Sequence, residues 1–127
     1  IRSGNDKMRD MTMPSFGKDG ILTKEQVADV ATYVMSLSDT AVKGTDTGKQ
    51  LFADNCASCH GEDAKGNIEM GAPNLTDKIW LYGSGVAAVE AQVNQPKHGV
   101  MPAWEGRLDP ITIKSLAVYI HSLGGGK

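Results

Sequence analysis

The chain has 127 residues, a formal net charge of −2 and 22% charged residues. These values fit one ordinary domain or a small domain with an appendage, and they disfavour nucleic-acid binding through bulk positive charge. No apolar run reaches the roughly 18 residues of a membrane helix, and no signal peptide is visible. Because the chain begins at Ile1, we interpret it as a fragment or a processed product, and a membrane anchor upstream stays an open alternative.

Helical patterns follow one another along the chain, so we expect an all-α fold. Thr23-Lys24-Glu25-Gln26 has the pattern of a capping box at a helix start. Pro96 should end one helix, and Pro110 suits the first turn of the last one. Residues 61–79 are rich in Gly, Pro, Asn and Asp and are expected to form a loop. The helices are expected over residues 23–37, from Asp46 or Thr47 through a pair of cysteines, over 85–95, and over 110–123.

A partial internal repeat is the largest feature of the sequence. Met13-Pro14-Ser15-Phe16 precedes a helical stretch that ends in Ala-Thr-Tyr-Val-Met-Ser-Leu, and Met101-Pro102-Ala103-Trp104 precedes one that ends in Ala-Val-Tyr-Ile-His-Ser-Leu. The first copy lacks a front half, so we interpret residues 1–38 as the C-terminal half of a truncated unit. Residues 39–44 are then a linker, and residues 45–127 form the complete unit.

The only two cysteines lie in the sequence Cys-Ala-Ser-Cys-His at residues 56–60. A zinc site needs a second ligand pair, and a thioredoxin-like motif needs strands, which the pattern does not predict. The motif is instead typical of c-type haem attachment. Residues three apart share one helix face, so Cys56 and Cys59 can reach one edge of a porphyrin, and His60 offers a nitrogen to the iron.

The sixth ligand of the iron must come from elsewhere in the chain. Met101 is the preferred candidate, because thioether sulfur suits haem iron and Pro102 restricts the backbone beside it. His98 is a rival ligand, while Met70 lies only ten residues from His60 and is remote.

With these motifs, residues 45–127 resemble a class I cytochrome c. The resemblance implies that Gly48 and Phe52 of the N-terminal helix pack against Leu116 and Tyr119 of the last helix. Gly-Ala-Pro-Asn-Leu at residues 71–75 is similar to the family's Gly-Pro-Asn-Leu segment, which implies that the Pro73 carbonyl accepts a hydrogen bond from the far nitrogen of His60 and places Asn74 beside the cofactor. Trp80, Tyr82 and Trp104 are expected to wall the haem.

Nearly the whole chain resembles the diheme subunit III of cbb3-type cytochrome c oxidases. The segments that carry this resemblance are Ala-Pro-Asn-Leu-Thr-Asp at 72–77, Trp-Leu-Tyr-Gly at 80–83 and His-Gly-Val-Met-Pro-Ala-Trp at 98–104. It implies one covalent haem c in this chain and a second haem in the intact parent. Met13 would be the axial ligand of that second haem, with Met8 and Met11 as neighbouring alternatives.

The function that this resemblance implies is single-electron transfer, relayed from a donor cytochrome toward the catalytic subunit of the oxidase. The chain alone should catalyse nothing, and the partners are the other oxidase subunits and the donor cytochrome. Thioether attachment requires export, which places the domain in the bacterial periplasm or at the periplasmic face of the inner membrane. Three alternatives stay open: a peroxide-reactive haem with a labile Met101, a free periplasmic carrier, and a haem-free thiol redox domain.

Overall fold

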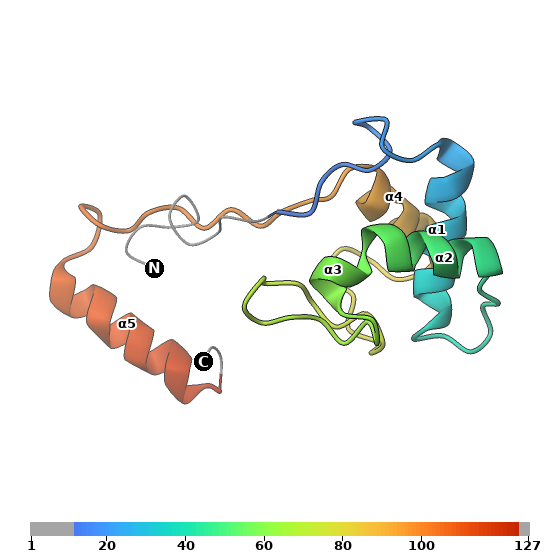
Figure 1. The fold of residues 1–127 in the computed structure, drawn as a ribbon. Helices are drawn as coiled ribbons and strands as arrows, with labels where there is room; N and C mark the ends of the chain where they lie inside the picture. Colours follow the sequence, from blue (N-terminus) through green and yellow to red (C-terminus); the bar gives the residue numbers. More distant parts are fainter. Residues whose placement is uncertain (1–11, 125–127) are drawn as a thin grey trace. The chain divides into compact units, whose positions relative to one another are not determined.

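The computed structural model describes residues 12–124 (Figure 1). Met8 and Met11, which were named as alternatives to Met13, lie outside the described residues. The described chain divides into two compact units, a first unit of residues 12–97 and a second unit of residues 98–124. The predicted domain limits at residues 38, 44 and 45 stay a prediction.

The predicted all-α class is confirmed. Within residues 12–124 the β-type pairing consists of two isolated bridges, Asn67 with Ala72 and Glu105 with Leu108. Helices form close to where the sequence predicted them, and the cysteine motif lies across the break between two of them. The helices are α1 (Lys24–Ser36), α2 (Asp46–Asn55), α3 (Ala57–His60), α4 (Val86–Asn94) and α5 (Pro110–Ser122).

Local capping explains where α1 and α2 begin. Thr23 and Gln26 form the predicted capping box, in which each side chain accepts a hydrogen bond from the other's backbone N–H. Thr45 caps α2, because its hydroxyl oxygen accepts a hydrogen bond of 2.9 Å from the Gly48 N–H. The same hydroxyl donates to the Asp29 carboxylate at 3.3 Å, so the start of α2 is tied to α1.

The first unit has its hydrophobic core between α1, α2 and α4 (Figure 1). Val30 is fully buried, and Phe52 and Val89 are nearly so. Gly48 permits the close crossing of α1 and α2, since a Cβ there would lie 2.3 Å from the Asp29 carbonyl oxygen and 2.8 Å from the Tyr33 Cβ. Gly48 and Phe52 thus lie against α1 in this unit, and their implied contact with Leu116 and Tyr119 stays a prediction.

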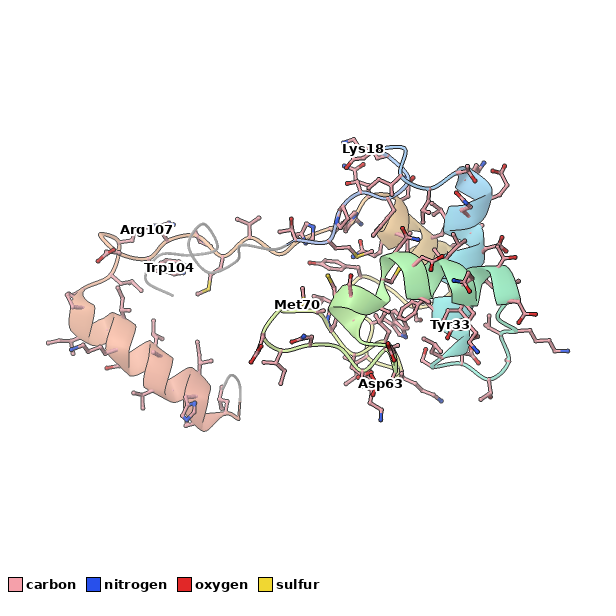
Figure 2. The ribbon with its side chains drawn as sticks, viewed as in Figure 1. Lys18, Tyr33, Asp63, Met70, Trp104 and Arg107 are labelled. Atoms are coloured by element: carbon pink, nitrogen blue, oxygen red, sulfur yellow. The ribbon has the colours of Figure 1, made fainter. Side chains whose placement is uncertain are left out.

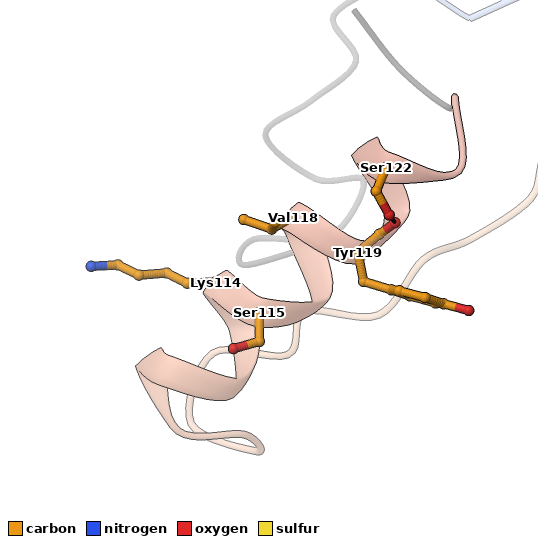
Figure 3. A pocket seen from close by; sticks show the side chains of 5 residues that line it. All are labelled: Lys114, Ser115, Val118, Tyr119 and Ser122. Atoms are coloured by element: carbon orange, nitrogen blue, oxygen red, sulfur yellow. Dashed lines mark hydrogen bonds between the residues drawn. The ribbon is translucent and has the colours of Figure 1, made fainter.

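The second unit contains α5 and the segment before it. Asp109 caps α5 by accepting hydrogen bonds from two backbone N–H groups, and Pro110 occupies the first turn as predicted. Figure 2 labels Trp104 and Arg107 in the preceding segment, where the guanidinium carbon lies 4.7 Å from the indole ring centre. Figure 3 shows one shallow face of α5, where Ser122 donates a hydrogen bond to the Tyr119 carbonyl oxygen at 2.6 Å.

Among residues 12–124, none of the helices combines the length and apolar character that crossing a lipid bilayer demands.

Candidate haem-attachment site

The two cysteines lie where α2 gives way to α3. Cys56 is the residue that joins the two helices. Its N–H donates to the Phe52 carbonyl oxygen at 2.8 Å, and its own carbonyl oxygen accepts from the N–H of His60 at 2.9 Å. One helical turn therefore separates Cys56 from Cys59, which puts both sulfurs toward the same side of the chain. Both cysteines are free thiols, with Cys56 buried and Cys59 half-buried.

His60 is buried and held in one orientation. Only 8% of it is exposed, and its Nδ1 atom lies 3.0 Å from the Pro73 carbonyl oxygen. The contact that the resemblance implied between these two residues is therefore present. A backbone carbonyl can only accept, so Nδ1 carries the proton, and Nε2 keeps the lone pair that a metal ion would use.

A loop closed by backbone pairing brings Pro73 to His60. Asn67 and Ala72 exchange two hydrogen bonds of 2.9 Å, and the His60 carbonyl oxygen accepts from the Gly66 N–H at 2.8 Å. Ala72, the residue by which this segment differs from the family's Gly-Pro-Asn-Leu, is thus the residue that closes the loop. Leu75 ties the loop's exit back to Ala64 with a hydrogen bond of 2.8 Å.

Gly66 is a site residue that the sequence reasoning missed. Its φ of +85° is accessible to few residues other than glycine, and a Cβ there would lie 2.5 Å from the Ala72 carbonyl oxygen and 2.7 Å from the Pro73 carbonyl carbon. The backbone of residues 72–74 includes the Pro73 carbonyl that accepts from His60. This backbone can lie so close to residue 66 only because residue 66 has no side chain. A glycine between the haem motif and the Pro-Asn segment is the signal that could have indicated this.

Burial perturbs one of the two thiols. Removal from solvent raises the pKa of the Cys56 thiol to about 11, and the neighbouring Cys59 adds to the effect. Cys56 is therefore neutral at physiological pH and suits an apolar neighbour rather than a charged one.

The other residues of the first unit that were predicted to contact the cofactor occupy the segment after this loop. Trp80 is half-buried and packs against the core that includes Cys56, whereas Tyr82 is more exposed, at 38%. The Asn74 side chain accepts two hydrogen bonds from Thr76, so its visible role is to shape the turn. Cofactor contacts by these three residues stay predictions.

The second unit holds the remaining predicted site residues. Met101 is 38% exposed, and Trp104 is half-buried beneath Arg107. The rival ligand His98 is exposed. Met13 belongs to the first unit, where it is partly buried against the core.

Comparison with known proteins decides the family. Residues 43–120 match the family described as cytochrome c oxidase, cbb3-type, subunit III. The chain belongs to this family. The cbb3 subunit III family is one of electron-transfer cytochrome c subunits of the oxidase rather than catalytic subunits, as the sequence predicted.

Curated relatives extend the match across the chain. A cbb3-type cytochrome c oxidase subunit FixP from Bradyrhizobium diazoefficiens is 58% identical over 99% of this chain and 44% of its own length. The subunit FixP of Sinorhizobium medicae is 57% identical over the whole chain and 44% of its own length. The subunit CcoP of Cereibacter sphaeroides is 48% identical over 97% of the chain and 43% of its own length. This cbb3 subunit III chain thus spans less than half of the length of these relatives.

A cytochrome c domain with this Cys-x-x-Cys motif implies covalently bound haem c. The donor set fits that group: two free thiols lie one turn apart, and a neighbouring imidazole is already oriented by a carbonyl. Cys56 and Cys59 would hold the porphyrin edge and His60 the iron.

Replacing Gly66 by alanine should weaken this site. The variant must adopt an unfavourable φ and also displace backbone atoms of residues 72–74, so we expect Gly66→Ala to cost about 2–4 kcal/mol of unfolding free energy. Urea denaturation measures this loss. Gly20→Ala is the matched control, because Gly20 also has a positive φ of +72° but has no atom within 4 Å of the added Cβ. Equal losses in the two variants would contradict a packing role for Gly66.

The buried thiol makes a pH-dependent prediction for the haem-free chain. The folded state holds the Cys56 proton up to about pH 11, whereas an unfolded cysteine releases it near its ordinary pKa of about 8.5. Between these values the unfolded state binds fewer protons, so stability should fall as pH rises, by roughly 1–2 kcal/mol near pH 10. Urea midpoints at pH 7.5 and 10 measure the fall. The urea midpoint of a Cys56→Ala chain, which lacks the thiol, should fall less. An equal fall in both chains would contradict the assignment of this pH dependence to Cys56.

Proposed function

We propose that this chain transfers single electrons through one haem c, attached to Cys56 and Cys59 and ligated by His60 and a methionine sulfur. Met101 is the proposed axial methionine. The observation that carries the proposal is the His60–Pro73 hydrogen bond at 3.0 Å beside two free thiols. This hydrogen bond occupies Nδ1 of His60 and leaves Nε2 available to bind iron.

The chain's own residues would fix the group and its surroundings. Thioether links from Cys56 and Cys59 would hold the porphyrin edge at the α2–α3 junction, so the cofactor could not dissociate. Donation from the Nδ1–H of His60 to the Pro73 carbonyl raises the basicity of Nε2 and keeps the imidazole from rotating. When bound, the haem supplies an iron that cycles between the ferrous and ferric states, and a methionine ligand raises its potential. Binding of the iron by both His60 and a methionine would leave no coordination site for small oxidants.

The wider roles of the chain follow from its relatives and are proposals. We propose that residues 1–38 are the C-terminal half of a first cytochrome c unit, residues 39–44 a linker and residues 45–127 a complete unit. The intact parent would then carry a second haem c. It would relay electrons from a donor cytochrome toward the catalytic subunit of a cbb3-type oxidase. It would lie in the bacterial periplasm or at the periplasmic face of the inner membrane.

Intact mass and visible absorption of the matured chain test the proposal. We expect the mass of one added haem, no titratable thiol, and a ferric spectrum with the long-wavelength charge-transfer band of a methionine–iron bond. A colourless chain with two free thiols would refute haem attachment. A haem chain that binds cyanide or peroxide rapidly in the resting state would instead support the peroxide-reactive alternative.

A further inference from the structure

Ala64 has a backbone conformation that alanine rarely adopts. Its φ is +57°, and it is the only residue other than glycine with a positive φ in the part of the chain that the structure describes. A positive φ brings the Cβ of an L-residue too close to the following carbonyl oxygen, so neighbouring contacts must enforce it. Backbone outliers of this kind cluster at functional sites. Ala64 lies four residues after His60, in the loop that leads to Pro73.

Hydrogen bonds fix the backbone on both sides of Ala64. Its N–H donates to the Gly61 carbonyl oxygen at 3.0 Å, which closes a four-residue turn. The N–H of Lys65 donates to a carboxylate oxygen of Asp63 at 3.2 Å, so the Asp63 side chain spans residue 64 as in an Asx turn. Figure 2 labels Asp63 in the loop that follows α3. The two peptide groups that flank Ala64 are therefore both held in place.

The side chain of Ala64 is also restricted. Ala64 is 2% exposed and belongs to the same cluster of buried residues as Cys56. A larger side chain at this position would have to displace core atoms in addition to adopting the unfavourable φ. Residue 64 is thus constrained in both its size and its backbone conformation.

The carbonyl group of Ala64 connects this turn to the hydrogen-bond partner of His60. It accepts a hydrogen bond of 2.8 Å from the N–H of Leu75, which lies two residues after Pro73. The Pro73 carbonyl oxygen lies 3.0 Å from His60 Nδ1. A change of φ at residue 64 would rotate its carbonyl group relative to the turn and withdraw the acceptor from Leu75. The contact between Pro73 and His60 therefore depends on the backbone of residue 64.

We propose that Ala64 is a positioning residue for His60: its left-handed backbone holds Leu75 and thereby sets the Pro73 carbonyl against Nδ1. This inference rests on the proposed haem attachment. Because Pro73 accepts from the Nδ1–H group, the strength of that hydrogen bond sets how strongly Nε2 donates to iron. Residue 64 thus tunes the reduction potential through the hydrogen bond.

Ala64→Val in the matured chain tests the positioning role. Valine is β-branched and disfavours a positive φ, so we expect residue 64 to turn and the Pro73 carbonyl to move away from His60. In nuclear magnetic resonance spectra of the reduced form, the His60 Nδ1–H signal should shift upfield, and this proton should exchange with water about tenfold faster. The reduction potential should become more positive, since a weaker imidazole donor favours the ferrous state.

The sign of the potential shift separates positioning from a general loosening of the core. Loosening admits water to the haem, which favours the charged ferric state and makes the potential more negative. Ala31→Val is the matched control, because Ala31 is also buried but lies within helix α1. It should leave the Nδ1–H signal at its wild-type position. A more negative potential in Ala64→Val, or the same change of signal in both variants, would overturn the proposal.

Ala64→Gly tests the backbone conformation without added volume, so it also serves if valine prevents folding. Glycine adopts a positive φ without strain, so the Nδ1–H exchange rate should stay within about twofold of wild type. A loss of protection as large as that expected for valine would show that the buried methyl group, rather than the backbone, positions Pro73, and would overturn the proposal. A wild-type chain that carries no haem after maturation would overturn the proposed function instead.

Discussion

Replacement of both Cys56 and Cys59 by alanine is expected to give a chain that carries no covalent haem after maturation. The two thiols are the only cysteines in the sequence, so no other side chain can form a thioether. The structure places them on either side of one helical turn, immediately before the oriented His60. Intact mass should show the bare polypeptide, and a denaturing gel stained for haem peroxidase activity should stay blank.

The two variants that each lack one cysteine test the two thioether links separately. Cys56→Ala and Cys59→Ala should each keep one thioether and leave one vinyl group conjugated with the porphyrin, which shifts the visible bands to longer wavelengths. Ser58→Ala is the matched control, since Ser58 is an exposed residue between the two cysteines. It should retain both links and the wild-type spectrum. Covalent haem in the double variant would contradict the assignment of the motif.

Gly48→Val is expected to produce the largest loss of stability among changes outside the haem motif. A side chain at position 48 would overlap the Asp29 carbonyl oxygen, which belongs to the backbone of α1 and cannot rotate away. The two helices must therefore separate, which opens the contact between Tyr33 and Phe52. We expect a loss of about 3 kcal/mol or more in unfolding free energy, measured by urea denaturation of the matured chain.

Ala53→Val gives the comparison for this experiment. Ala53 lies on the same helix but is exposed, so the change tests valine in α2 without a clash. Its cost should stay below about 1 kcal/mol, the range of helix propensity. If the two valine variants unfolded at the same urea concentration, the close crossing at Gly48 would not contribute to stability.

Much of the local structure could be predicted because its causes lie within a few residues. The hydroxyl of Thr23 and the amide of Gln26 cap α1 whatever surrounds them, and Pro110 fits only the first turn of a helix. The haem motif is likewise a local pattern, since the spacing of Cys56, Cys59 and His60 fixes which side chains share a face. Even the contact between His60 and Pro73 followed from a recognisable segment.

The role of Gly66 could not be derived from the sequence in the same way. Its importance depends on backbone atoms at Ala72 and Pro73, which approach only after the loop has closed. A glycine in a polar loop has many uses, and only the close approach shows which one applies here.

The sequence by itself determined the helices, the haem-attachment motif and the partial internal repeat. Only the tertiary structure decided that α1 packs against both α2 and α4, because local propensity sets where a helix begins and ends but not what its apolar face contacts. That arrangement depends on contacts between residues distant in sequence: the approach of Asp29 to Gly48, and the burial of Val30 in a core shared with α4. Packing of this kind is a property of the assembled chain, so no window of the sequence contains it.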